Sequence, residues 1–221
     1  MLTVHHLNNS RSQRVLWLLE ELGVPYEVVR YERNPKTMLA PEALRRIHPL
    51  GKSPVITEDG QTIAETGAII QYILDRHGKG RLMPERGSPD YLRFVYWLHY
   101  AEGSAMTPLL LKLIFRRVAE QPAPFFVRPI LRQVAGRVQQ VLVDPQLALH
   151  TGYWENELGQ SSWFAGDFTA ADIQMSFPVE AAASRTSFAS YPRLKDFLER
   201  IHARPAYQRA LERGGAYSLG G

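Results

Sequence analysis

The residues best suited to chemistry fall between positions 48 and 70, in the stretch HPLGKSPVITEDGQTIAETGAII. Ser53 precedes a proline at the start of a short β-rich run. If the bond before Pro54 is cis, the backbone N–H and C=O of Ser53 turn outward, where an extended peptide can pair with them. Glu65 and Thr66 stand where a helical pattern begins, and the free N–H groups of a first helical turn attract a carboxylate. The stretch therefore predicts a site for a small, acidic, peptide-like ligand.

Two short strands and a helix must position these residues. Residues 55–57 and 61–64 are predicted strands, and Asp59-Gly60 between them is typical of a hairpin turn. Thr66 is the expected N-cap of the following helix. Any hairpin followed by a helix shares most of these features, and most X–Pro bonds in folded proteins are trans, so an ordinary structural role stays open. The helical spacing rests on Ile69, Ile70, Ile73 and Leu74.

The preceding residues predict alternating strands and helices. Residues 2–6 and 26–31 are predicted strands, and a helix between them ends at Gly23. Residues 41–47 form a short predicted helix with a proline in its first turn. Two strands joined by a helix favour a parallel pair, so we expect the order βαβαββα over residues 1–77.

The pattern changes after Gly78 and predicts a second domain. Residues 79–89 are rich in glycine, proline and charge, which is typical of a linker. Beyond them no strand pattern occurs, and Pro108 is expected to interrupt the first helices. Thr169 and Asp172 have the spacing of a capping box, and the tail from Gly214 is expected to fray. The fold class is therefore an α/β domain (1–78), a linker (79–89) and an all-helical domain (90–221).

The composition excludes several classes of protein. With 221 residues and 45% hydrophobic content, the chain can bury a sizeable core. The absence of cysteine rules out disulfides, thiolate metal sites and a protein thiol nucleophile, and fits a reducing cytoplasm. No signal peptide or apolar run of membrane-spanning length is present. The net charge is +4, but the basic residues are spread among acids, which favours a solvated surface that attracts anionic ligands over a nucleic-acid site.

Four stretches together resemble the cytosolic glutathione transferase family, and in particular its bacterial and fungal, serine- or asparagine-dependent members. The resemblance implies a thioredoxin-like N-terminal domain and an all-helical C-terminal domain. It also implies glutathione as co-substrate, no metal, a small electrophile as second substrate, a cytoplasmic homodimer and a role in detoxification. No nucleic acid and no membrane span are expected. The stretches are NNSRSQRVLWLLEELGVPYE, HPLGKSPVI, AETGAIIQYI and WFAGDFTAADI.

The resemblance implies that Ser10 is the catalytic residue. Its hydroxyl is expected to donate to the glutathione sulfur and favour the thiolate, which is the nucleophile. Asn8, Asn9 and Ser12 are rivals for this role in the same loop, and Asn9 is also expected to contact glutathione. Ser10 or Ser12 is equally compatible with a plain helix N-cap.

The resemblance also assigns binding roles to residues in the stretch between positions 48 and 70. Pro54 matches a cis-proline, and the backbone of Ser53 is expected to pair with the cysteinyl part of glutathione. Glu65 is expected to take the ammonium of the γ-glutamyl group, and Thr66 its carboxylate. Lys52 is the expected holder of the glycyl carboxylate, because residues 37–39 lack the histidine that many members carry there. The acceptor pocket is expected to include Tyr100, Gly103 and Met106, which are also plausible helix-packing residues.

Three alternatives to a transferase stay open at this point. A glutathione-dependent peroxidase or reductase uses the same thiolate, and only the acceptor pocket separates it from a transferase. A non-catalytic binding or interaction protein on the same fold is the second. The third concerns residues 113–137, whose mixture of phenylalanine and arginine suits a membrane surface or an acidic partner as well as an ordinary helix pair.

Overall fold

A four-stranded mixed sheet forms the N-terminal part of the protein in a computed structural model that describes residues 1–215 and 217–219. The sheet order is β2-β1-β3-β4; β1 and β2 are parallel, whereas β3 is antiparallel to both of its neighbours. Asp59 and Gly60 both have positive φ, as the predicted two-residue hairpin turn requires. The strands are β1 (Leu2–Leu7), β2 (Tyr26–Tyr31), β3 (Val55–Glu58) and β4 (Gln61–Ala64).

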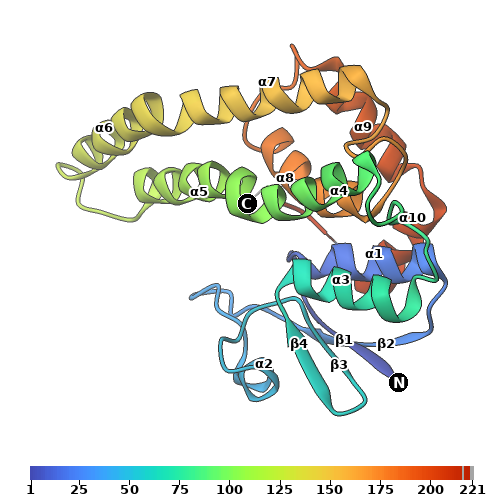
Figure 1. The fold of residues 1–221 in the computed structure, drawn as a ribbon. Helices are drawn as coiled ribbons and strands as arrows, with labels where there is room; N and C mark the ends of the chain where they lie inside the picture. Colours follow the sequence, from blue (N-terminus) through green and yellow to red (C-terminus); the bar gives the residue numbers. More distant parts are fainter. Residues whose placement is uncertain (216, 220–221) are drawn as a thin grey trace.

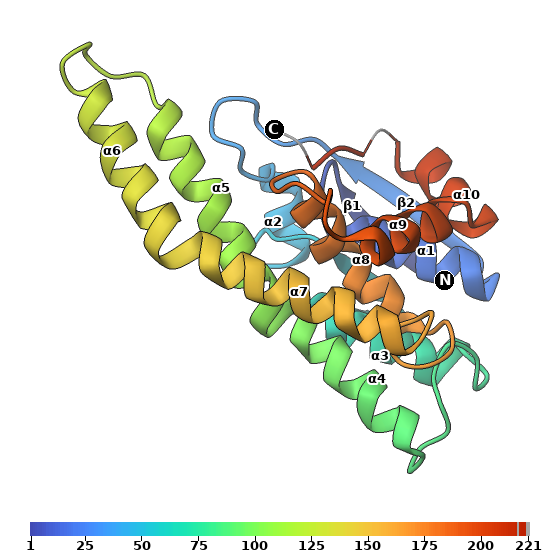
Figure 2. The ribbon, with the colours of Figure 1, turned by 90° about the horizontal axis from the view of Figure 1, so that it is seen from above.

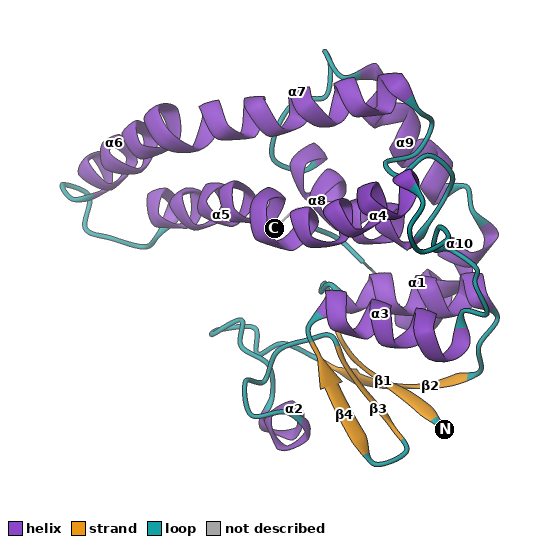
Figure 3. Ribbon diagram, in the orientation of Figure 1, coloured by secondary structure: helices purple, strands orange, loops and turns teal. Residues whose placement is uncertain are grey.

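Three helices complete this part of the fold: α1 (Ser12–Leu22), α2 (Glu42–Ile47) and α3 (Thr66–His77). Helices α1 and α3 lie between the sheet and the helical part of the molecule, whereas α2 lies apart from them (Figure 1; Figure 3). Nearly every residue of α1 is buried for this reason, and Gly23 ends the helix in the left-handed region at φ 64°. The order βαβαββα confirms the predicted thioredoxin-like fold.

The remainder of the described chain is helical, which confirms the predicted fold class. Two long antiparallel rods dominate it, and their joint tip projects beyond the rest of the molecule (Figure 2). The first rod is α4 (Pro89–Tyr100), a π-helical segment (Ala101–Ala105) and α5 (Met106–Glu120); the second is α6 (Arg128–Val138), a π-helical segment (Gln139–Val143) and α7 (Asp144–Gln160). Helices α8 (Ala170–Ala183), α9 (Pro192–His202) and α10 (Pro205–Gly214) follow.

The structure corrects the expected break at Pro108. This proline is the third residue of α5, close behind the π-helical segment, and the chain runs through from α4 by way of that segment. Between α3 and α4, residues 78–88 form neither helix nor strand. The predicted capping box is present: the Thr169 N–H donates to Asp172 Oδ2 at 2.9 Å, and Thr169 Oγ1 accepts from the Ala171 N–H at 3.2 Å.

The C-terminal tail is held in place, contrary to the expected fraying, over the part that the structure describes. The Tyr217 hydroxyl donates to Glu180 Oε2 at 2.8 Å, and the Ser218 N–H donates to Asn9 Oδ1 at 2.8 Å. Leu219 packs against the hydrophobic core. Burial and the Glu180 carboxylate raise the pKa of Tyr217 well above its ordinary value, so the hydroxyl stays a donor. Residues 216, 220 and 221 of the expected frayed tail lie outside the described residues.

Candidate functional site at the junction of the sheet and the helices

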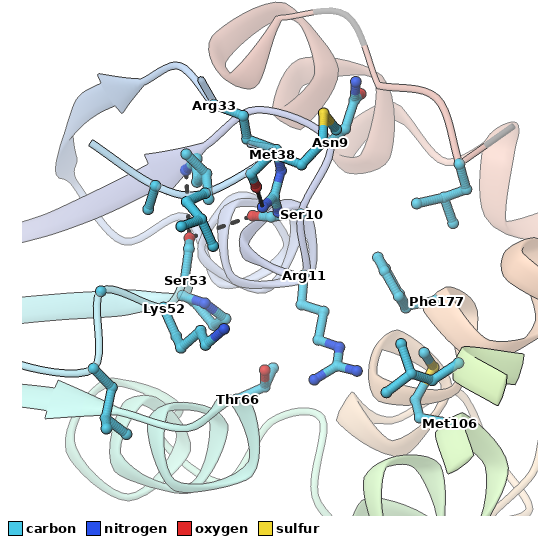
Figure 4. A pocket seen from close by; sticks show the side chains of 18 of the residues that line it. Asn9, Ser10, Arg11, Arg33, Met38, Lys52, Ser53, Thr66, Met106 and Phe177 are labelled. Atoms are coloured by element: carbon cyan, nitrogen blue, oxygen red, sulfur yellow. Dashed lines mark hydrogen bonds between the residues drawn. The ribbon is translucent and has the colours of Figure 1, made fainter. Parts of the chain in front are cut away.

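A cavity of about 670 Å³ opens between the thioredoxin-like part and the helical part. Figure 4 shows Lys52 and Ser53 on one side of it, with Met106 and Phe177 across the space. The structure brings eight of the ten predicted site residues together at this cavity. They are Asn9, Ser10, Lys52, Ser53, Pro54, Glu65, Thr66 and Met106.

Ser10 is buried in the cavity wall at the start of a chain of hydrogen bonds. Its Oγ lies 2.7 Å from Ser12 Oγ, which lies 2.9 Å from His6 Nδ1. Burial and the charge of Arg30 lower the pKa of His6 to about 4, so the imidazole is neutral near pH 7. The N-cap position of α1 is Arg11, whose side chain makes no capping hydrogen bond, but Ser10 Oγ accepts from the N–H of Ser12, the first residue of α1, at 3.3 Å. The two serines are therefore engaged with each other and with His6, and the Ser10 hydroxyl also accepts from the first N–H of α1.

The segment before β3 is fixed to the end of β1. The Ser53–Pro54 bond is cis, as the resemblance implied. The Ser53 hydroxyl donates to the His5 carbonyl at 3.2 Å and accepts from the Leu7 N–H at 3.3 Å. Ser10 Oγ donates to the same hydroxyl at 3.3 Å, so the first loop and the β3 loop are joined at the cavity (Figure 4).

The start of α3 differs by one residue from the prediction. Glu65, not Thr66, holds the N-cap position, and Glu65 has a φ of 69°. A positive φ of this kind costs a non-glycine residue roughly 1–3 kcal/mol, so the surrounding contacts must hold the Glu65 backbone in this conformation. The Thr66 hydroxyl caps nothing because it accepts from Arg14 Nη2 at 3.2 Å. The first turn of α3 therefore keeps free N–H groups at the cavity.

Arg14 is a buried positioning residue that sequence reasoning did not assign. Its guanidinium donates to Thr66 Oγ1, to the Gln174 carbonyl at 2.8 Å and to Glu102. Glu102 also pairs with Arg11 at 3.2 Å. Burial alone would raise the pKa of Glu102, but the charges of Arg14 and Arg11 outweigh it and hold that pKa below its ordinary value. These contacts connect α1, the π-helical segment after α4, and α8 behind the start of α3.

The side of the cavity near Lys52 carries two further basic groups that the sequence reasoning missed. Arg45 and His48 line the cavity beside Lys52. Gly51 has a φ of 56°, and a Cβ at this position would lie 2.7 Å from Arg45 Cγ, so only glycine lets the arginine side chain pass. Their positions in the sequence could have predicted them, because one lies in the short helix α2 and the other directly follows it.

Two residues of the predicted acceptor wall do not line the cavity. The Tyr100 hydroxyl accepts from Trp154 Nε1 at 3.0 Å and bonds His150, so the ring turns toward α7. Gly103 lies in the π-helical segment and is also absent from the wall. A π-helical segment adds a residue to the turn and rotates the face that follows, which leaves Met106 at the cavity without Tyr100 and Gly103.

The described helices are either too short or too polar to cross a membrane. Across residues 1–215 and 217–219, histidine, aspartate and glutamate nowhere gather in groups of three that could hold a metal ion.

Residues 10–76 match the N-terminal domain of glutathione S-transferases. Glutathione S-transferase 3 of Schizosaccharomyces pombe is 35% identical over 215 residues, which cover 96% of this chain and 88% of that protein. Glutathione S-transferase 1 of Saccharomyces cerevisiae is 31% identical, with 98% and 96% covered. A crystal structure of a glutathione S-transferase from Actinobacillus pleuropneumoniae superposes with a TM-score of 0.78 at 32% identity, covering 99% of this chain and 94% of that one. With these relatives spanning nearly its whole length, the chain belongs to the glutathione S-transferase family of enzymes.

Proposed function

We propose that the protein binds glutathione in this cavity, holds its thiol as the thiolate and conjugates it to a small electrophile. The observation that carries the proposal is the convergence of Ser10, Ser53 and Thr66, from three separate segments, on one cavity wall. Catalysis then consists of positioning and electrostatics, because glutathione itself supplies the sulfur.

Each part of glutathione has a matching group in the cavity. The backbone of Ser53 pairs with the cysteinyl residue, as an added strand would. Glu65 takes the ammonium of the γ-glutamyl group, and Thr66 with the first N–H groups of α3 takes its carboxylate. Lys52, with Arg45 beside it, holds the glycyl carboxylate.

Ser10 is the proposed thiolate-stabilising donor. A free thiol has a pKa near 8.5, so only a small fraction is ionised at neutral pH. A hydroxyl that donates to the sulfur and a helix N-terminus nearby both favour the anion and lower that pKa. Ser12 stands behind Ser10 at 2.7 Å and fixes where the Ser10 hydroxyl lies.

The test is a pH titration of the bound thiol by its ultraviolet absorbance, in the wild type and in two loop variants. We expect a wild-type pKa about one to two units below that of free glutathione. Ser10→Ala should restore the free value and lower kcat/KM at least about tenfold. Asn9→Ala tests the rival donor, whose Oδ1 accepts from the Ser218 N–H, and should leave the thiol pKa low.

Three results would count against parts of this proposal. A thiol pKa that stays as low as the wild type's in Ser10→Ala, but rises toward the free value in Asn9→Ala, would move the donor role to Asn9. Tight glutathione binding with an unshifted thiol would make the protein a binding module. No binding at all would remove the proposed function and leave the family assignment intact.

We also propose that the protein is a cytoplasmic homodimer with a role in detoxification, as is typical of its family. In this proposal residues 1–78 bind glutathione, residues 79–89 are a linker, and residues 90–221 supply the acceptor wall. Exposed apolar side chains along the second rod support the dimer. These are Ile130, Val134, Val141, Leu142 and Leu149.

A further inference from the structure

The cavity has a second half that is apolar and lies on the helical side. Met106 and Phe177 form its wall across from Lys52 and Ser53 (Figure 4). The residues that extend this apolar wall are Leu110, Leu113 and Leu219. An acceptor that occupies this half therefore has an apolar body.

Three arginines reach the same cavity from different segments: Arg33 after β2, Arg117 on α5 and Arg185 after α8. Arg33 donates to the carbonyls of Asn8 and Met38, and Arg185 donates to the carbonyl of Leu109 at 3.2 Å. Within residues 1–215 and 217–219, none of the three arginines forms an ion pair with an aspartate or glutamate. Their positive charge at the cavity is not compensated by an acidic side chain among the described residues.

The charge of Arg117 acts on both of the other guanidinium groups. Burial lowers the pKa of Arg185, and the charges of Arg116 and Arg117 lower it further. Burial and Arg117 lower the pKa of Arg33 in the same way. The Nε atom of Arg185 is buried and has no hydrogen-bond partner among the described residues. Like charges gathered beside an apolar wall cost free energy that a bound anion would offset.

The charges of glutathione do not account for this cluster. Glutathione carries two carboxylates and one ammonium, and the proposed binding mode places them at Lys52, at the start of α3 and at Glu65. Glu65 is the only acidic residue among the described residues that line the cavity. Arg11, which also lines it, forms an ion pair with Glu102. Arg33, Arg117 and Arg185 are therefore left for a second anion.

We infer that the acceptor is an amphipathic organic anion, an apolar electrophile bearing a carboxylate. Its body lies against Met106 and Phe177, and its carboxylate lies against Arg117 and Arg185. The inference rests on the proposed glutathione-conjugating function and names the class of substrate that this function serves.

The reaction itself follows the proposed chemistry. For an aryl chloride, the glutathione sulfur attacks the carbon that bears chlorine, a C–S bond forms, and the C–Cl bond breaks with its electron pair leaving on chloride. The thiol proton passes to solvent. The carboxylate takes no part in bond making and acts only through its charge-assisted hydrogen bonds.

The test compares 4-chloro-3,5-dinitrobenzoate with the neutral 4-chloro-3,5-dinitrobenzamide, at saturating glutathione. Each kcat/KM is divided by the rate constant of the uncatalysed reaction with glutathione, which removes the difference in intrinsic reactivity. We expect the normalised value to be at least about tenfold higher for the benzoate, since a charge-assisted hydrogen bond contributes that much.

Variants assign the effect to the arginines. Arg117→Gln and Arg185→Gln should each lower kcat/KM for the benzoate about tenfold, with little change for the benzamide or in the KM for glutathione. Arg117→Lys should restore much of the loss, because it keeps the charge. Arg137→Gln, an exposed arginine of α6 that does not line the cavity, is the matched control and should change neither substrate.

The outcomes separate the inference from the function beneath it. Equal normalised rates for the two substrates would overturn the inference while leaving the transferase function in place. A raised KM for glutathione in Arg117→Gln would assign the cluster to glutathione and would equally overturn it. Failure to conjugate either substrate would instead remove the proposed function. Arg117 is exposed, so its variants test the inference without disturbing the core.

Discussion

At the scale of single residues, Arg14 is the group on which the start of α3 depends. Its side chain is 1% exposed and meets Thr66, Gln174 and Glu102. Arg14→Met should lower the free energy of unfolding by about 3 kcal/mol, because it leaves the buried Gln174 carbonyl without its donor and Glu102 with only the more exposed Arg11 as partner. It should also raise the KM for glutathione. Urea denaturation and steady-state kinetics measure the two effects.

Arg11→Met is the matched control for Arg14. Arg11 pairs with the same carboxylate, but its side chain is 37% exposed, so its loss should cost less than about 1 kcal/mol. Equal losses of stability in the two variants would show that burial of Arg14 is not what makes it important.

His6 makes stability depend on pH. Its folded-state pKa is about 4, against an ordinary value of 6.5. Between these values the unfolded chain binds a proton that the folded protein excludes, so stability is present above pH 6.5 and falls as pH decreases toward 4. His6 should account for about 2.5 kcal/mol of loss between pH 7.5 and 4.5. Urea denaturation of the wild type and of His6→Gln at both pH values measures how much of the loss in unfolding free energy is due to His6. An unchanged pH dependence in His6→Gln would contradict the prediction.

At the scale of elements, the start of α8 is held by Asp172 more than by Thr169. Asp172 is buried and accepts from the N–H groups of Phe164 and Thr169 and from the Thr169 hydroxyl. Asp172→Ala leaves these donors unsatisfied and should cost about 3 kcal/mol or more. Thr169→Ala removes one cap and should cost about 1 kcal/mol.

Chemical denaturation of these two variants and of the double variant checks this order. Because both residues belong to one network, the double variant should lose less than the sum of the single losses. Strict additivity would mean that the two residues act independently.

At the scale of the whole molecule, the second rod carries an apolar stripe that this chain does not cover. Leu142 is 62% exposed and Val134 is 54% exposed. In the proposed homodimer such a stripe is buried against the partner, and a buried charge there is costly. Multi-angle light scattering should give twice the chain mass for the wild type, and Val134→Glu with Leu142→Glu should shift it toward the monomer. A monomeric wild type at micromolar concentration would contradict the prediction.

The sequence alone determined the order of the elements, the hairpin at Asp59-Gly60, the capping box at Thr169 and the grouping of Ser53, Glu65 and Thr66 at one cavity. All of these depend on patterns within a few neighbouring residues, because turns, caps and helical spacing are local. The resemblance supplied the cis bond at Pro54, which the residues by themselves did not favour.

Only the tertiary structure decided which distant side chains meet. Arg14 reaches Glu102 and Gln174, Asn9 accepts from Ser218, and Arg117 comes to the cavity with Arg185, across separations that no local pattern spans. Tyr100 and Met106 were both expected in the acceptor wall, but only Met106 lines the cavity, and a π-helical segment lies between the two. Side-chain contacts between elements depend on how the elements pack, and that packing is a property of the whole chain.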